Sequence, residues 1–146
     1  MSTTTTLAGG CLCGALRYNL IFPMASPPNC LHCHCGMCKK STGAYFETYV
    51  TTPYAQLHWT TDRRPKQFQS SANVKRGFCP NCGSPLTFEA IDDPKISVIV
   101  GSLDDVDAVK AMSHIYFESV ARVAKEVDRD LPKYRGESEL IQEPKA

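Results

Sequence analysis

The segment Cys79-Pro80-Asn81-Cys82-Gly83 has the two-residue cysteine spacing of a zinc knuckle. Gly83 can take the positive φ that turns backbone N–H groups toward the two sulfurs. Redox-active cysteine pairs have the same spacing, so this segment by itself is only a moderate indication of a metal site. Its meaning depends on the other cysteines of the chain.

A second cysteine pair, Cys11-Leu12-Cys13-Gly14, also ends in glycine. Together the two pairs offer four thiolates, which complete a tetrahedral zinc site with no vacant position. Such a site would tie the start of the domain to its middle. Metal binding of this type contributes on the order of 10 kcal/mol to folding, which is comparable with the stability of a small domain. We therefore expect a structural zinc at Cys11, Cys13, Cys79 and Cys82.

The third cluster is Cys30-Leu31-His32-Cys33-His34-Cys35-Gly36-Met37-Cys38, which has more candidate ligands than one zinc can use. In a closed site, Cys30, Cys33, Cys35 and Cys38 form a second four-thiolate centre. In an open site, Cys33, Cys35 and Cys38 hold the metal, and water or substrate takes the fourth position. The spacing leaves both alternatives open, although four ligands within so short a segment leave little chain to wrap a tetrahedron.

An open three-thiolate zinc suits thiol chemistry. The cation stabilises a thiolate well below the usual thiol pKa of about 8.5, and it can polarise a carbonyl oxygen. Lys39 and Lys40 follow the cluster directly. They either offset the negative charge of three sulfurs or are solvated surface groups.

Composition narrows the classes of protein to consider. The chain has 146 residues, eight of them cysteine, and a net charge of +1, so no strong positive charge favours nucleic acid or an anionic membrane. No apolar run approaches the roughly 18 residues of a membrane span. The polar start of the chain, residues 1–6, does not resemble a secretory signal, which predicts a cytoplasmic protein with reduced thiols. Metal binding then explains the clustered cysteines better than disulfides do.

Short strands are the expected elements, because glycine and proline interrupt the chain every few residues. Residues 15–22 alternate apolar and polar side chains, the pattern of a half-buried strand. Similar patterns predict strands at 44–51, 74–78, 85–90, 95–100 and 113–118. A helix is expected for one turn after Cys38 and around 119–127. No domain boundary is visible, so the sequence predicts one mainly β domain with its metal ligands on loops.

Three segments in this order resemble the glutathione-dependent formaldehyde-activating enzyme family, which also contains centromere protein V. They are Gly9-Gly10-Cys11-Leu12-Cys13-Gly14-Ala15-Leu16-Arg17-Tyr18, Cys33-His34-Cys35-Gly36-Met37-Cys38-Lys39-Lys40, and Phe78-Cys79-Pro80-Asn81-Cys82-Gly83-Ser84-Pro85-Leu86. Weaker similarities follow at Gly101-Ser102-Leu103-Asp104-Asp105, His114-Ile115 and Leu131-Pro132-Lys133-Tyr134. The resemblance covers one zinc domain at 7–135, leaving 1–6 and 136–146 as expected flexible termini.

The resemblance implies a β-tent of folded antiparallel sheets with zinc sites on the loops between strands. It implies two zinc ions per chain: a structural one at Cys11, Cys13, Cys79 and Cys82, and a catalytic one at Cys33, Cys35 and Cys38. Cys30 lies outside the family pattern, so the resemblance favours the open site. The implied activity is that of a carbon–sulfur lyase. Its substrate would be a glutathione-like thiol adduct such as S-hydroxymethylglutathione.

The main alternative is a non-catalytic binding module in which both zinc sites are structural. A nucleic-acid partner ranks last, because basic and acidic residues are balanced along the chain. We expect His34 to point away from the metal, because alternate side chains of an extended segment face opposite ways. His32 is expected to be solvated, and His114 to be a hydrogen-bonded core histidine.

Overall fold

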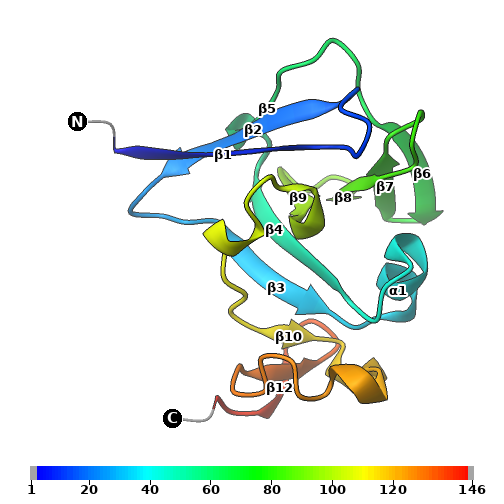
Figure 1. Cartoon of the computed structure of the whole chain (residues 1–146). Helices are drawn as coiled ribbons and strands as arrows, with labels where there is room; N and C mark the ends of the chain where they lie inside the picture. The colour runs from blue at the N-terminus through cyan, green and yellow to red at the C-terminus, as the bar shows by residue number, and fades with distance from the viewer. Residues whose placement is uncertain (1–2, 145–146) are drawn as a thin grey trace. The chain divides into compact units, whose positions relative to one another are not determined.

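The structure is a computed structural model that describes residues 3–144 (Figure 1). These residues form twelve strands, one α-helix and five short 3-10 helices, which confirms the predicted mainly β fold with little helix. The chain comprises two compact units. Unit 1 contains Met1–Asn29 and Val50–Val109, and unit 2 contains Cys30–Tyr49 and Lys110–Ala146.

Unit 1 contains two sets of strands, ordered β1-β2-β5 and β4-β9-β8-β7-β6. The strands are β1 (Thr4–Gly10), β2 (Arg17–Pro23), the end of β4 (Glu47–Pro53), β5 (Leu57–Trp59), β6 (Lys66–Ser71), β7 (Val74–Phe78), β8 (Pro85–Ala90) and β9 (Lys95–Ile99). The 3-10 helices are η1 (Tyr54–Gln56), η2 (Val100–Ser102) and η3 (Val106–Ala108). The pairs β1–β2, β2–β5, β6–β7, β7–β8 and β8–β9 are antiparallel.

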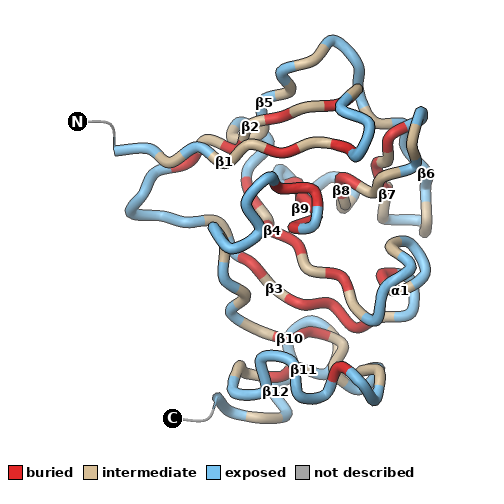
Figure 2. The backbone as a smooth tube through the Cα atoms, viewed as in Figure 1, coloured by how far each residue is buried: buried red, intermediate tan, exposed pale blue. Residues whose placement is uncertain are grey.

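The alternating side chains of β2 form one wall of the unit 1 core. Tyr18, Leu20 and Phe22 are buried, whereas the residues between them are partly exposed (Figure 2). This period of two is the signal that predicts a strand at 15–22, and burial of each large side chain stabilises the fold by about 1.5–3 kcal/mol. The strand prediction is therefore confirmed.

Gly9 is required where β1 meets β2. The register pairs Gly9 with Tyr18, whose hydroxyl hydrogen-bonds to the Ser102 hydroxyl at 2.6 Å. A Cβ atom on Gly9 would lie 2.4 Å from the Tyr18 oxygen, so any other residue would displace the ring. Burial raises the pKa of Tyr18 to about 12, so the phenol stays protonated.

The four strands β6 to β9 form an antiparallel meander. The predicted strands at 74–78 and 85–90 agree with β7 and β8, and the predicted strand at 95–100 ends one residue early, as β9. Outside the meander, the prediction at 44–51 corresponds to β4, which is shifted toward the C-terminus. The turn between β7 and β8 carries Cys79 and Cys82.

Unit 2 has the strand order β12-β11-β10-β3-β4. Its elements are β3 (Asn29–Cys33), α1 (Gly36–Thr42), the start of β4, β10 (His114–Ile115), η4 (Phe117–Ser119), η5 (Arg122–Ala124), β11 (Lys133–Arg135) and β12 (Glu139–Gln142). The family resemblance implied antiparallel sheets, but β10 pairs in parallel with both β3 and β11.

Several predicted elements of unit 2 are shorter or longer than expected. The predicted strand at 113–118 is reduced to β10, because Tyr116 adopts a left-handed conformation (φ 53°) that ends the strand. The helix expected after Cys38 begins at Gly36, since the Cys35 sulfur accepts a hydrogen bond from the Cys38 N–H and caps the first turn. At 119–127 the helical elements are the last residue of η4 and the short η5.

Strands also occupy parts of the segments expected to be flexible. β1 begins at Thr4, within 1–6, and β12 lies within 136–146. Residues 1–2 and 145–146 of these predicted termini lie outside the described residues. The single zinc domain at 7–135 stays a prediction. No helix in the part of the chain that the structure describes is long and apolar enough to cross a membrane.

Candidate metal sites

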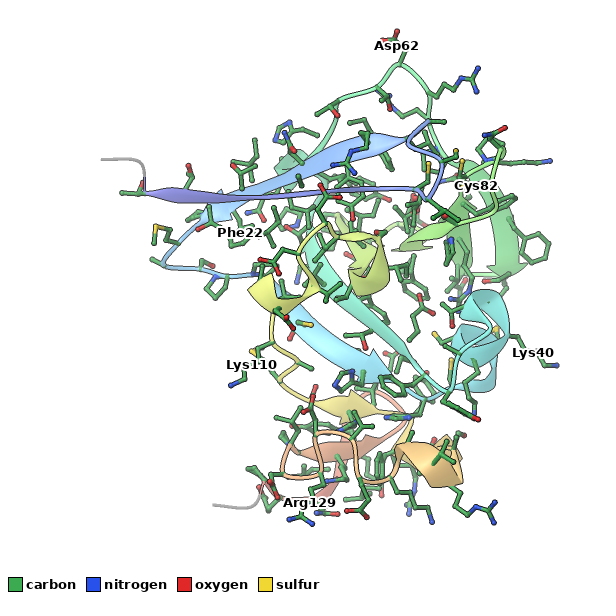
Figure 3. The ribbon with its side chains drawn as sticks, viewed as in Figure 1. Phe22, Lys40, Asp62, Cys82, Lys110 and Arg129 are labelled. Atoms are coloured by element: carbon green, nitrogen blue, oxygen red, sulfur yellow. The ribbon has the colours of Figure 1, made fainter. Side chains whose placement is uncertain are left out.

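Four cysteines of unit 1 gather their sulfurs at one point, which we call the four-sulfur group. Cys11 and Cys13 follow β1, and Cys79 and Cys82 lie between β7 and β8. Other sulfur atoms lie beside the labelled Cys82 (Figure 3). All four sulfurs lie within 4.8 Å of one another, with 3.6 Å between Cys11 and Cys13 and 3.8 Å between Cys13 and Cys79.

These distances fit a tetrahedral metal site. Zinc–sulfur bonds of about 2.3 Å place neighbouring sulfurs of a tetrahedron about 3.8 Å apart. The two measured separations match this value, and the donor set of four thiols is the one that structural zinc uses. The four-sulfur group could therefore hold a metal ion with no vacant position.

Hydrogen bonds from the loops stabilise negative charge on these sulfurs. The Leu16 N–H donates to the Cys11 sulfur at 3.2 Å, and the Asn81 side-chain N–H donates to the Cys13 sulfur at 3.2 Å. Donation from the Ser84 hydroxyl and backbone lowers the pKa of Cys82 to about 5. The thiolate form that a metal requires is thus favoured at Cys82, whereas burial raises the pKa of Cys79 to about 11.

The two loops of the four-sulfur group have the same local geometry. Gly14 and Gly83 both have φ +77°, and each donates its N–H to the carbonyl of the first cysteine of its loop. A residue with a side chain rarely adopts this conformation. The glycine that follows each cysteine pair in the sequence therefore forms the turn that brings the sulfurs together.

Three cysteines of unit 2 form a second group, which we call the three-sulfur group. Cys33 ends β3, Cys35 caps α1, and Cys38 lies in the first turn of α1. The three sulfurs lie within 4.8 Å of one another, so this group could also hold a metal ion. Cys33 and Cys38 are buried, whereas Cys35 is partly exposed. The group therefore reaches the surface of the unit through Cys35.

The three sulfurs share negative charge. Hydrogen bonds from the thiols of Cys33 and Cys38, together with the N–H groups of Cys38 and Met37, lower the pKa of Cys35 to about 2. Its thiolate in turn raises the pKa of Cys33 to about 12, and the pKa of Cys38 is raised as well by hydrogen bonding to the same sulfurs. A cation bound by the three sulfurs would displace the thiol protons of this group.

Cys30 belongs to neither group among the described residues. It lies three positions before Cys33 on β3, and side chains three apart on a strand face opposite sides. Burial raises the pKa of Cys30 to about 11, so it stays a neutral thiol. The fourth sulfur that the closed alternative needs is thus on the other side of the strand.

A chain of buried histidines supports the segment between Cys33 and Cys35. His34 hydrogen-bonds to His114 Nδ1 at 2.9 Å, and His114 Nε2 contacts the Asp128 carbonyl oxygen at 3.0 Å. The carbonyl can only accept, so His114 donates through Nε2 and accepts the proton of His34 Nε2. Burial, followed by the charge of His114, lowers the pKa of His34 to about 4, which keeps this ring neutral.

The histidine predictions have different outcomes. His114 is fully buried and hydrogen-bonded, which confirms the prediction of a core histidine. His34 is outside the three-sulfur group, and its Nδ1 is buried without a hydrogen-bond partner among the described residues. The prediction of a solvated His32 is wrong, because this ring is 7% exposed and bonds to Thr48 and Asp128. These partners are distant in sequence, so no local pattern predicts them.

The two lysines after the three-sulfur group have different surroundings. Lys39 donates through its amine to the Ser119 carbonyl at 2.6 Å, which ties α1 to the end of η4. Lys40 is exposed and points away from the ribbon (Figure 3). Lys40 is therefore a surface group, and Lys39 has a structural contact.

Comparison with known proteins places the chain in a family. The family model of the glutathione-dependent formaldehyde-activating enzyme matches residues 6–119, a range that contains both sulfur groups. The chain belongs to this family. The activity for which the formaldehyde-activating family is named is enzymatic and concerns glutathione. No curated protein matches the chain.

A crystal structure of a Rhodobacter sphaeroides protein is similar in fold to this member of the formaldehyde-activating family. The two chains are 22% identical, the match covers 71% of this chain and 96% of the other, and the TM-score is 0.55. At this identity the similarity concerns the fold alone.

Proposed function

We propose that the protein is a zinc-dependent carbon–sulfur lyase acting on an adduct of glutathione or a related thiol, such as S-hydroxymethylglutathione. The observation that carries this proposal is the three-sulfur group: it offers three ligands rather than four, and Cys35 is accessible. Three protein ligands leave a coordination position for substrate. Membership of the formaldehyde-activating family supports glutathione as the thiol.

Cys33, Cys35 and Cys38 are the proposed ligands of the catalytic metal. Zinc bound there would lower the pKa of the substrate thiol and hold its sulfur beside the electrophilic carbon. The protein contributes a rigid ligand loop: the His34 N–H donates to the Ile115 carbonyl at 3.1 Å, and β10 pairs with β3 beside Cys33. No separate protein nucleophile is needed for this reaction.

Cys11, Cys13, Cys79 and Cys82 are the proposed ligands of a second, structural zinc. Their four donors leave no position for substrate. The group joins the two chain segments that make up unit 1. Two zinc ions per chain and a small thiol substrate are therefore proposed.

A reducing compartment such as the cytoplasm is the proposed location. All eight cysteines are free thiols, and thiols persist where glutathione and thioredoxin keep them reduced.

A Cys35→Ser variant tests the proposed activity. Formation of S-hydroxymethylglutathione from formaldehyde and glutathione is followed by exchange NMR, and metal content is measured by mass spectrometry. We expect a folded protein that retains one zinc and has no turnover above the uncatalysed rate. The control is Cys30→Ala, which should retain two zinc ions and full activity, because Cys30 is in neither sulfur group.

Full activity of the Cys35→Ser variant would contradict the proposal. X-ray absorption at the zinc edge distinguishes the alternative binding module, in which both metals have four sulfur ligands. An oxygen or nitrogen scatterer at one site supports the enzyme.

A further inference from the structure

Unit 1 has a pocket that none of its cysteines lines. The pocket has a volume of about 540 Å³, which is in the range of small-molecule sites, and residues of β5, β6, β8 and β9 contribute to it (Figure 1). Its apolar wall includes Leu57, Trp59 and the buried Ile96. Its charged groups are the Glu89 carboxylate and the Arg64 guanidinium. The pocket thus combines an aromatic ring with a negative and a positive side chain.

The Glu89 carboxylate is held in place by three neutral donors. The Tyr54 hydroxyl donates to Oε2 at 2.7 Å, and the Gln67 side-chain N–H donates to Oε1 at 2.7 Å. The Thr87 hydroxyl donates to Oε1 as well, at 3.3 Å. The position of the carboxylate is therefore fixed by its neighbours before any ligand arrives.

The charge of Glu89 has no counterion in the part of the chain that the structure describes. No ion pair joins it to a cation, not even to Lys75, its cross-strand neighbour on β7. A carboxylate has about four acceptor sites, and three hydrogen bonds already use most of them. Glu89 therefore offers the pocket a negative charge rather than free acceptor sites, which suits a cation with few N–H groups.

The Trp59 ring already attracts a cation of this kind. The Arg64 guanidinium carbon lies 6.0 Å from the centroid of the Trp59 ring, and Tyr18 fixes the ring by an edge contact with 5.6 Å between centroids. A guanidinium spreads its charge and is weakly hydrated. Arg64 is exposed, and its Nη1 donates only to the exposed carbonyls of Thr61 and Arg63. Its side chain can therefore leave the ring when another cation binds.

We propose that this pocket binds a small organic cation that carries a methylated ammonium group, with its nitrogen between the Trp59 ring and the Glu89 carboxylate and with Arg64 displaced. A methylated ammonium has a dispersed charge, few or no N–H groups and an apolar surface, so it matches the ring, the carboxylate, Leu57 and Ile96. The site uses no cysteine, so the inference is independent of the proposed function.

Choline and its neutral analogue 3,3-dimethyl-1-butanol test the proposal, because they differ by a carbon in place of the charged nitrogen. Trp59 is the only tryptophan of the chain, so its fluorescence reports occupation of the pocket directly. Calorimetry on the zinc-loaded protein gives both dissociation constants. We expect choline to bind about tenfold more tightly than the neutral alcohol, since the ring and the carboxylate both favour the charge.

Three variants separate the contributions, and a fourth is the control. Glu89→Gln keeps an acceptor for the neighbouring donors but removes the charge, and it should lose about fivefold of the preference for choline. Trp59→Leu, followed by calorimetry, should lose a similar factor. Arg64→Ala should bind choline about threefold more tightly, because the competing guanidinium is gone. Asp107→Asn removes an exposed carboxylate outside the pocket and should change nothing.

Each outcome supports or overturns the proposal. A wild type that shows neither a fluorescence change nor heat with choline overturns it. Equal affinity for choline and the neutral alcohol also overturns it, because the pocket would then be merely apolar. A preference that survives in Glu89→Gln, or weaker choline binding by Arg64→Ala, excludes the proposed placement of the cation. Circular dichroism verifies the fold of each variant, and the exposed Arg64 keeps the test available if Glu89→Gln does not fold.

Discussion

Replacing Cys13 by serine should remove the metal of the four-sulfur group and destabilise the protein. The Cys13 and Cys79 sulfurs are 3.8 Å apart across 66 positions of sequence, so a metal bound by both closes a long loop in unit 1. Closing a loop of this length lowers the conformational entropy of the unfolded chain, which corresponds to about 4 kcal/mol of free energy at 25 °C. This is a large fraction of the roughly 5–15 kcal/mol by which domains are stable.

The expected result is a loss of at least about 4 kcal/mol in the free energy of unfolding, since loop closure is one part of the contribution of the metal, together with a fall from two zinc ions per chain to one. Urea denaturation followed by circular dichroism gives the free energy, and mass spectrometry gives the metal content. Cys30→Ala is the control, because this buried thiol is outside both sulfur groups and its removal leaves only a small cavity. It should retain both metals and lose about 1 kcal/mol.

The reasoning would be refuted if Cys13→Ser retained two zinc ions and unfolded at the urea concentration of the wild type. A variant that lost the metal but not the stability would refute the loop-closure argument alone. The loss of zinc and the loss of stability are therefore judged separately.

Three further predictions concern stability. Burial lowers the pKa of His114, so below about pH 6.5 the unfolded chain binds a proton there that the folded chain does not. The free energy of unfolding should therefore fall as the pH drops below about 6.5, and it should fall less steeply in His114→Gln. Equal pH slopes for the two proteins in urea titrations would contradict this. Gly9→Ala should lower the free energy of unfolding by about 1–3 kcal/mol in the same assay, because the added Cβ would lie 2.4 Å from Tyr18. The control Gly101→Ala should be nearly neutral, because its Cβ would meet no atom within 4 Å. The pKa of Asp104 is lowered by its ion pair with Arg17, so the difference in melting temperature between wild type and Asp104→Asn should be present at pH 7 and should shrink progressively as the pH falls below about 4. A difference that stays constant down to low pH would exclude this cause.

Strands with a clear hydrophobic alternation were predictable from the sequence. β2 carries its own signal, because one of its faces is buried and the other is not. β7 and β8 were also predicted as strands, although the buried residues of each are adjacent rather than alternating. β1 has no such signal in its threonines and glycines, and it is a strand because its backbone pairs with β2 along the whole of Thr4–Gly10. β3 consists of residues that resemble a ligand loop, and its strand conformation comes from pairing with β10, about 80 residues later in the chain.

The two sulfur groups could also be predicted from the sequence, apart from the question whether Cys30 belongs to one of them. Cysteines on short tethers meet whatever the rest of the fold does, so the spacing of Cys33, Cys35 and Cys38 brings these three sulfurs together locally. Whether Cys30 joins them depends on the face of β3 from which it projects. The spacing of the cysteines could not decide this, because the direction of the Cys30 side chain differs between a loop and a strand.

By itself, the sequence determined which cysteines can serve as ligands and the family to which the chain belongs, because both depend on residue type and short-range spacing. Only the tertiary structure decided what surrounds those ligands. His32, His34 and His114 meet because β10 pairs with β3, and Tyr116 leaves the strand because Gly136 holds its backbone. These contacts join residues that are about 20 to 80 positions apart, and no local pattern encodes a partner at that distance.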